Sequence, residues 1–95
     1  MKMDFDWDEQ KRRKNLEKHG VDFYDAYLMF QTRTIQERDR RRDYGEPRYI
    51  ALGEWGDRIL VVAFTVREGT IRIISARKAN RREQKRYWKQ KGNNS

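Results

Sequence analysis

The sequence predicts an α+β domain with an antiparallel sheet, helices near the N-terminus and a basic helix at the C-terminus. Segments rich in β-branched and alternating residues concentrate between 48 and 78, where short turns separate three strands. Two segments with helix signals, 9–19 and 23–30, precede them, and a third begins after Asn80. The order is strand, helix, helix, edge strand, three-strand meander, helix, which is typical of an α+β fold.

Composition limits the size of the core and the classes of function. The 95 residues suffice for one domain, 1–95, and 40% are charged against about 25% in an average domain. We therefore expect one sheet covered mainly on one face, while 13% aromatic residues argue against disorder. The lack of cysteine excludes disulfides, thiolate metal sites and a cysteine nucleophile. No apolar run has membrane-spanning length and no secretory segment is visible, so the expected location is the cytoplasm.

The first strand and the first helix have clear boundaries in the sequence. Residues 4–7 alternate polar and apolar side chains, which suits a short strand. Either Asp6 or Asp8 can cap the following helix, 9–19, and Gly20 is a typical helix stop. This stretch is therefore predicted as strand, helix and stop.

The first helix has an unusual polar composition. Leu16 is its only aliphatic residue, and the residues that share its side at helical spacing are Asp8, Arg12, Asn15 and His19. If Leu16 faces the core, these polar groups lie beside the sheet and need hydrogen-bond partners. They either knit the fold together or line a cleft, and we favour the first interpretation.

The second helix is predicted from an apolar stripe. Asp22 caps the segment 23–30, whose apolar side chains at helical spacing are Phe23, Ala26, Tyr27 and Phe30. This stripe indicates core packing. Residues 31–39 alternate weakly and are predicted as an edge strand, and the charged run 39–47 as a solvated loop.

The meander comprises strands at 48–53, 58–67 and 70–78. Residues 59–66 are apolar on both faces apart from Thr65, which predicts a central strand. Regular alternation along the last strand places on one face Ile71, Ile73, Ser75 and Arg77. It places on the other face Arg72, Ile74, Ala76 and Lys78.

Most of the positive charge lies at the C-terminal end. The chain has a net charge of +8, and residues 77–91 contain eight Lys or Arg and one Glu. Asn80 with Glu83 is a capping signature, and the basic residues that then fall within an arc of about 140° are Arg81, Arg82, Lys85, Arg86 and Lys89. Glu83 and Tyr87 lie on the opposite side and can face the body. Residues 91–95 are expected to form a disordered tail.

The charge pattern favours a nucleic-acid partner. A pI near 10 indicates that the partner is a polyanion such as a nucleic acid, and the alternative partner is an acidic protein. The stripe on the last helix is of one sign, which favours a track for a phosphate backbone over an ordinary solvated face. No glycine-rich phosphate loop or H-E-x-x-H motif is present, and a single histidine cannot assemble a histidine-based metal site. An enzyme would need basic and phenolic groups without a metal.

Several motifs occur together between residues 4 and 88. The most specific feature is the pairing of Lys18-His19-Gly20 with the run 72–79. The others are Phe5-Asp6-Trp7-Asp8, Asn15-Leu16, Asp43-Tyr44-Gly45-Glu46, Arg48, Gly53, Thr65, Arg67, Glu83 and Tyr87. In these residues the chain resembles the BrnT family of bacterial toxins, which belong to type II toxin–antitoxin pairs.

The resemblance implies a RelE-like fold and a ribonuclease that inhibits translation by cutting RNA, without a metal or cofactor. In such enzymes a ribose 2′-OH attacks the adjacent phosphate. The implied partners are RNA, free or on the ribosome, and a BrnA-like ribbon-helix-helix antitoxin. Operator DNA would be bound only through the antitoxin complex, and no membrane is involved. The rival interpretation is a non-catalytic module that binds nucleic acid or the antitoxin.

The leading catalytic candidates are Arg67 and Arg77, each at the end of a strand. We predict that they form a phosphate-handling pair, because guanidinium groups stabilise phosphoryl oxyanions bidentately. The alternative is that they form salt bridges with Glu46 or Asp43. Glu46 is itself a candidate general base, or the partner of Arg48.

The remaining candidates have weaker support. His19 can shuttle a proton, although its place at a helix C-terminus favours a structural role. Trp7 can stack on a base but is better explained as core, and Tyr87 is a candidate acid better explained as an anchor for the last helix. The predicted RNA-binding residues are Lys18, Lys78, Arg81, Arg82, Lys85 and Arg86.

Overall fold

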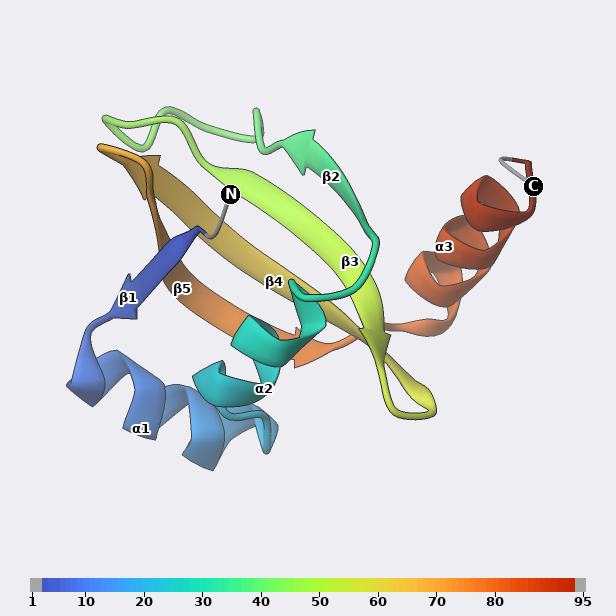
Figure 1. Cartoon of the computed structure of the whole chain (residues 1–95), viewed down its shortest axis with the longest axis horizontal. Helices are drawn as coiled ribbons and strands as arrows, with labels where there is room; N and C mark the ends of the chain where they lie inside the picture. The colour runs from blue at the N-terminus through green and yellow to red at the C-terminus, as the bar shows by residue number, and fades with distance from the viewer. Residues whose placement is uncertain (1–2, 94–95) are drawn as a thin grey trace.

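The structure, a computed structural model, describes residues 3–93 and contains three helices and one five-stranded sheet (Figure 1). The elements are β1 (Asp4–Trp7), α1 (Glu9–His19), α2 (Phe23–Met29), β2 (Thr34–Arg38), β3 (Tyr49–Trp55), β4 (Arg58–Arg67), β5 (Thr70–Lys78) and α3 (Arg81–Asn93). The strand order is β1-β5-β4-β3-β2, so β4 is central and β2 lies at an edge, as predicted. The mixed α+β class is confirmed.

The sheet is antiparallel except at one edge. β1 pairs in parallel with β5, from Asp4 opposite Thr70 to Trp7 opposite Ile73. The predicted antiparallel pairing is therefore wrong at this edge of the sheet. Alternation along a strand identifies its buried face but not its neighbour. The parallel pairing needs a long connection, which here comprises α1, α2 and the antiparallel strands β2, β3 and β4.

Helix α1 begins and ends as predicted. The Asp8 side chain, and not that of Asp6, accepts a hydrogen bond from the backbone of Lys11 at 3.1 Å. At the other end, Gly20 adopts φ +71°, a left-handed conformation that glycine tolerates without steric cost.

The residue of α1 that faces the core is Asn15. Asn15 is 7% exposed, whereas Leu16 is 40% exposed. The Asn15 carboxamide donates to the carbonyls of Val21 and Ala76 at 2.9 and 2.7 Å, and it accepts from the Ala76 N–H at 3.1 Å. Because β1 ends opposite Ile73, this carboxamide takes the place of a neighbouring strand beside Ala76. Asn15 therefore knits the fold together, as the favoured interpretation predicted.

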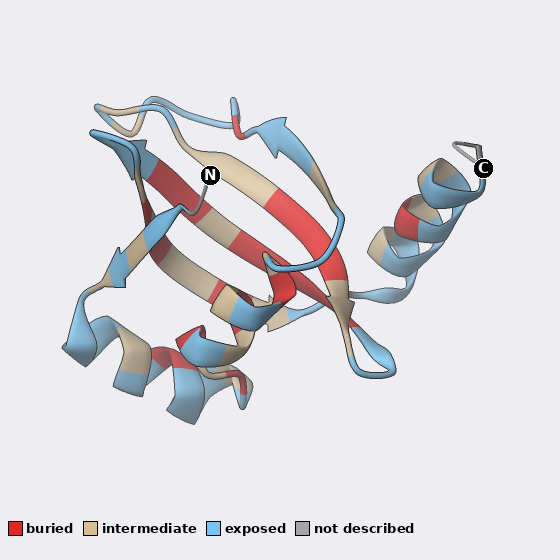
Figure 2. Ribbon diagram, viewed as in Figure 1, coloured by how far each residue is buried: buried red, intermediate tan, exposed pale blue. Residues whose placement is uncertain are grey.

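The main core lies between the sheet and the two N-terminal helices (Figure 2). The stripe predicted for α2 is in this core, with Phe23 and Ala26 fully buried and Phe30 partly buried against it. Met29 packs directly on Gly53 of β3, where an added Cβ would lie 2.6 Å from the Met29 Cγ. A glycine is therefore required under α2.

Helix α3 covers part of the opposite face and projects from one end of the sheet (Figure 1). Its buried Tyr87 packs in a small cluster that includes Leu52 and Val61, and its hydroxyl donates to Glu54 at 2.8 Å. Tyr87 is therefore an anchor. The helix continues to Asn93, where a tail from residue 91 was expected; residues 94 and 95 lie outside the described part. No helix within residues 3–93 is long and apolar enough to span a membrane.

Strand β5 contains an irregularity that the sequence pattern did not predict. Ala63 pairs with Ser75 and Phe64 pairs with Ile73, so Ile74 has no partner on β4. This β-bulge changes the phase of the strand, and regular alternation beyond it is wrong. Ala76 joins Ile71 and Ile73 in the main core, while Ser75 and Arg77 lie on the opposite face.

Candidate functional site

An arginine-rich groove lies on the sheet face away from α1 and α2, between α3 and the start of the loop after β2. Its volume is about 280 Å³. Its lining residues are Glu37, Arg38, Asp39, Arg40, Arg41, Ile50, Leu52, Val61, Arg77, Glu83 and Arg86. Five arginines thus surround three carboxylates over an apolar floor. We call this the arginine groove.

Arg77 reaches the groove from the end of β5. Both of its terminal nitrogens donate to the Glu83 carboxylate at 2.8 Å. Glu83 also accepts from the Asn80 backbone at 2.9 Å, while the Asn80 side chain accepts from the Glu83 backbone at 2.8 Å, which confirms the predicted capping box. The pKa of Glu83 is lowered mainly by the side-chain hydrogen bonds that Arg77 donates to it. The start of α3 therefore holds the guanidinium in place.

Asp39 organises the opposite wall of the groove. Its buried carboxylate accepts from the Arg41 Nε and Nη2 at 2.9 and 2.8 Å, and from the Tyr44 hydroxyl at 2.9 Å. The hydrogen bond from Arg41 is the main reason why the pKa of Asp39 lies well below its usual range. Thr65 of β4 fixes the far end of this loop by donating to the Pro47 carbonyl at 2.6 Å. The prediction of a solvated loop is therefore confirmed for most residues of the run 39–47, which are exposed, and wrong for the buried Asp39.

Two arginines beside the groove have no acidic partner. Arg38 and Arg40 are exposed, and neither forms an ion pair with any residue in the 3–93 range. Arg86, by contrast, projects from α3 and pairs with Glu37. The groove thus combines arginines already held by carboxylates with two that are available to an incoming anion.

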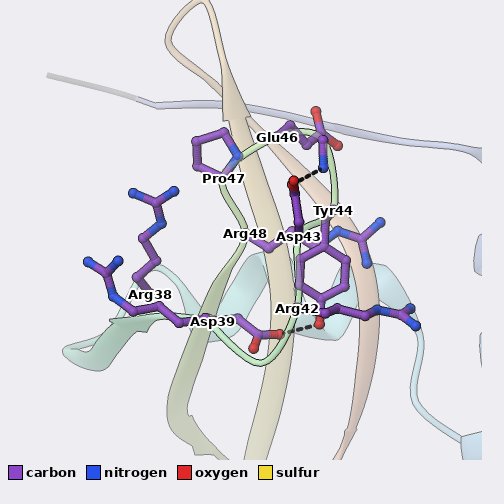
Figure 3. A pocket seen from close by; sticks show the side chains of 10 residues that line it. Arg38, Asp39, Arg42, Asp43, Tyr44, Glu46, Pro47 and Arg48 are labelled. Carbon is purple, nitrogen blue, oxygen red and sulfur yellow. Dashed lines mark hydrogen bonds between the residues drawn. The ribbon is translucent and has the colours of Figure 1, made fainter.

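A second cavity, of about 470 Å³, adjoins the groove within the loop between β2 and β3 (Figure 3). It shares Arg38, Asp39 and Arg40 with the groove. Its remaining lining residues are Arg42, Asp43, Tyr44, Gly45, Glu46, Pro47 and Arg48. We call it the loop cavity.

The structure separates Arg67 from Arg77. The two residues lie at opposite ends of the β4–β5 hairpin, since Arg67 pairs with Thr70 and Arg77 pairs with Val61. Six residues of strand between these positions correspond to about 20 Å, too far for both to bind one phosphate. The predicted pairing of Arg67 with Arg77 is therefore wrong. Arg67 forms the alternative salt bridge, donating to Glu46 at 3.0 and 3.1 Å, so Glu46 is not the partner of Arg48.

The other predicted residues are dispersed. Lys18 and His19 line a shallow cavity of about 220 Å³ beside α1, together with Ser75, and neither lines the arginine groove. Lys78 lies in a different cavity with Asp57 and Trp88. Four residues of the predicted track on α3 are exposed, namely Arg81, Arg82, Lys85 and Lys89. Trp7 packs on Phe23 and Tyr24, as expected of a core residue.

Sequence reasoning missed the arginines at the end of β2 and in the loop that follows it. Arg38, Arg40 and Arg41 were not singled out, although four of the five residues from 38 to 42 are arginines. This local excess of one charge was the available signal, and the intervening Asp39 made the run resemble ordinary mixed surface. Among residues 3–93, no group of three or more His, Cys, Asp or Glu side chains is placed to hold a metal ion.

The fold and the groove together define a class of protein: a small, basic α+β domain with a groove lined by guanidinium groups. Residues 7–83 match the family described as the BrnT ribonuclease toxin of type II toxin–antitoxin systems. The match covers most of the chain, and the chain belongs to this family.

A solved structure supports this assignment. The chain is similar to the ribonuclease toxin BrnT of Brucella abortus, with 30% sequence identity and a TM-score of 0.62. The similarity covers 84% of this chain and 100% of the Brucella chain. A search of curated proteins found no match.

Proposed function

We propose that this chain is a metal-independent endoribonuclease whose active site is the arginine groove. The observation that carries the proposal is the convergence of Arg77, Arg41 and the unpaired Arg38 and Arg40 on one cavity. Guanidinium groups in such an arrangement can neutralise the charge that develops on a phosphoryl group in the transition state. The arginines would thus supply the electrostatic stabilisation that a metal ion supplies in other nucleases.

The proposed reaction is transesterification. The ribose 2′-oxygen forms a bond to phosphorus while the bond from phosphorus to the 5′-oxygen of the next nucleotide breaks, leaving a 2′,3′-cyclic phosphate and a 5′-hydroxyl. The 2′-OH proton passes to a base and the leaving 5′-oxygen takes up a proton. Arg77 would bind the non-bridging oxygens, since Glu83 already fixes its orientation.

Glu37 is the proposed proton acceptor. It lines the groove, and only its Oε2 accepts a hydrogen bond, from Arg86, among residues 3–93. Glu83 fits this role less well, because its two oxygens accept from Arg77 and one also accepts from Asn80. His19 and Glu46 do not line the groove, so this assignment replaces the roles predicted for them from sequence.

The proposed partner is a BrnA-like ribbon-helix-helix antitoxin, which would neutralise the toxin and carry the complex to operator DNA. A net charge of +8 suits a partner that presents acidic groups. Free of this partner, the toxin would cut RNA in the cytoplasm, on or off the ribosome, and inhibit translation.

The experiment compares two arginines of equal chemistry. Labelled RNA is incubated in EDTA with the wild type, Arg77→Ala or Arg67→Ala, since each arginine forms a bidentate pair with a glutamate and only Arg77 lines the groove. We expect cyclic-phosphate ends from the wild type, a loss of about 10²–10³-fold in rate for Arg77→Ala, and a change of a few-fold at most for Arg67→Ala. Equal loss in both variants would refute the groove as the active site.

A non-catalytic binding module is the second candidate. The exposed stripe of α3 favours it, because Arg81, Arg82 and Lys85 lie outside the groove and can bind a phosphate backbone without any chemistry. RNA binding without cleavage by the wild type, both alone and with added ribosomes, would establish this candidate and exclude the nuclease.

A further inference from the structure

The loop cavity next to the groove has the features of a nucleotide site. We propose that it binds one nucleotide of the RNA strand beside the scissile phosphate, with the base on the Tyr44 ring and the phosphate at Arg38 and Arg40. The proposal rests on the proposed ribonuclease function and adds a subsite to it. The volume of the loop cavity, about 470 Å³, lies within the range of roughly 300–1,000 Å³ found for small-molecule sites.

Two guanidinium groups lie close to the Tyr44 ring. That of Arg48 lies 4.2 Å from the ring centroid, and that of Arg42 lies 5.0 Å from it. Arg48 is half-buried and its Nε is buried with no hydrogen-bond partner among residues 3–93, whereas Arg42 is exposed. Arg42 can therefore move aside, so that a base stacks between it and the ring, as bases do on tyrosine and arginine planes.

The ring is held in a fixed position relative to the groove. The Tyr44 hydroxyl donates to Asp39 (Figure 3). The same carboxylate binds Arg41 at the wall of the groove. A base stacked on Tyr44 would therefore be placed at a defined distance from the groove. Such preorganisation lowers the entropic cost of ordering a flexible strand.

The charges of the cavity set the orientation of the nucleotide. Arg38 and Arg40 line both the loop cavity and the groove, and they have no acidic partner among residues 3–93. A phosphate bound by these two arginines would therefore lie where the two cavities adjoin. Two carboxylates, Asp43 and Glu46, line the loop cavity but not the groove, as do two arginines, Arg42 and Arg48, so their charges balance there. The carboxylates can accept hydrogen bonds from N–H groups of a base. The phosphate is therefore placed at Arg38 and Arg40, which have no acidic partner in the described part of the chain, and the base toward Tyr44.

The test compares Tyr44→Phe with Tyr44→Leu. Both variants lose the hydroxyl bond to Asp39, and only the leucine variant loses the aromatic ring. Affinity is measured by fluorescence anisotropy with a short single-stranded 2′-O-methyl RNA, which lacks the attacking hydroxyl and cannot be cut. We expect binding by Tyr44→Leu to be about 5- to 150-fold weaker than by Tyr44→Phe, the range found when one stacked base is lost. Equal affinities would overturn the proposal.

A second comparison tests the proposal without altering the hydrogen bonds of the loop. Arg42→Ala removes the outer stacking group, and Arg33→Ala removes one exposed charge elsewhere as a control. We expect only Arg42→Ala to weaken binding beyond the effect of one lost charge, and equal effects would overturn the subsite. Cleavage of unmodified RNA by the wild type is scored separately, so a failure of the nuclease proposal is distinguishable from a failure of the subsite.

Discussion

Replacing Asn15 by alanine tests how the polar face of α1 stabilises the fold. The substitution removes three hydrogen bonds and leaves the Ala76 N–H and the carbonyls of Ala76 and Val21 without this partner. Each bond contributes about 1 kcal/mol net, and a buried group left unpaired costs about 1–3 kcal/mol. Water can reach part of this site from the shallow cavity that Asn15 lines, which reduces the loss. We expect the free energy of unfolding to fall by about 2–3 kcal/mol.

The assay is urea unfolding followed by circular dichroism. A loss of this size is large against a typical stability of about 5–15 kcal/mol, and it should lower the midpoint without changing the slope m. Gln10→Ala is the control, because Gln10 is exposed on the same helix and we expect an effect within about 0.5 kcal/mol. A loss below about 0.5 kcal/mol for Asn15→Ala would refute the view that its carboxamide stabilises the edge of β5.

Three further predictions concern charge. Replacing both Arg81 and Arg82 by alanine should flatten the salt dependence of single-stranded RNA binding by about 1.4 units of log K per log salt, and an unchanged slope would exclude the track on α3. The lowered pKa of Asp39 should contribute stability that is complete above about pH 5 and is lost as the pH falls further, so acid titrations of unfolding should show a smaller loss for Asp39→Asn. Burial, followed by the hydrogen bond to Glu54, raises the pKa of Tyr87 to about 12. Stability should therefore fall between about pH 10 and 12, and ultraviolet titration of Tyr87→Phe should lack the latest-ionising phenol.

Local sequence signals predicted the elements because local chemistry forms them. The caps at Asp8 and Gly20 and the capping box of Asn80 with Glu83 depend on residues within one turn of each helix. The parallel pairing of β1 with β5 depends on contacts between residues more than 60 positions apart, which no local period encodes. The same holds for Asn15, since its bond to Ala76 depends on where β1 ends.

The site was less predictable than the fold. Arg77 was identified from its place at a strand–helix junction, which the structure confirms, and it lines the groove. Arg67 was predicted as its partner because both residues lie at strand ends. Antiparallel neighbours run in opposite directions, so the C-terminal ends of β4 and β5 lie at opposite ends of the hairpin. The contribution of Arg38 and Arg40 depends on how the following loop folds back over the sheet, and Asp39 fixes that loop through contacts that charge counting cannot reveal.

The bulge at Ile74 has a consequence for comparing relatives of this chain. The bulge reverses which alternate residues of β5 face the main core. An insertion or deletion of one residue there would therefore turn Arg77 toward α1 and α2. The residue equivalent to Arg77 in a relative is therefore found by counting back from the cap of α3 at Asn80, and not forward from the start of β5. An alignment gap placed on the wrong side of Ile74 would assign a core residue to the groove.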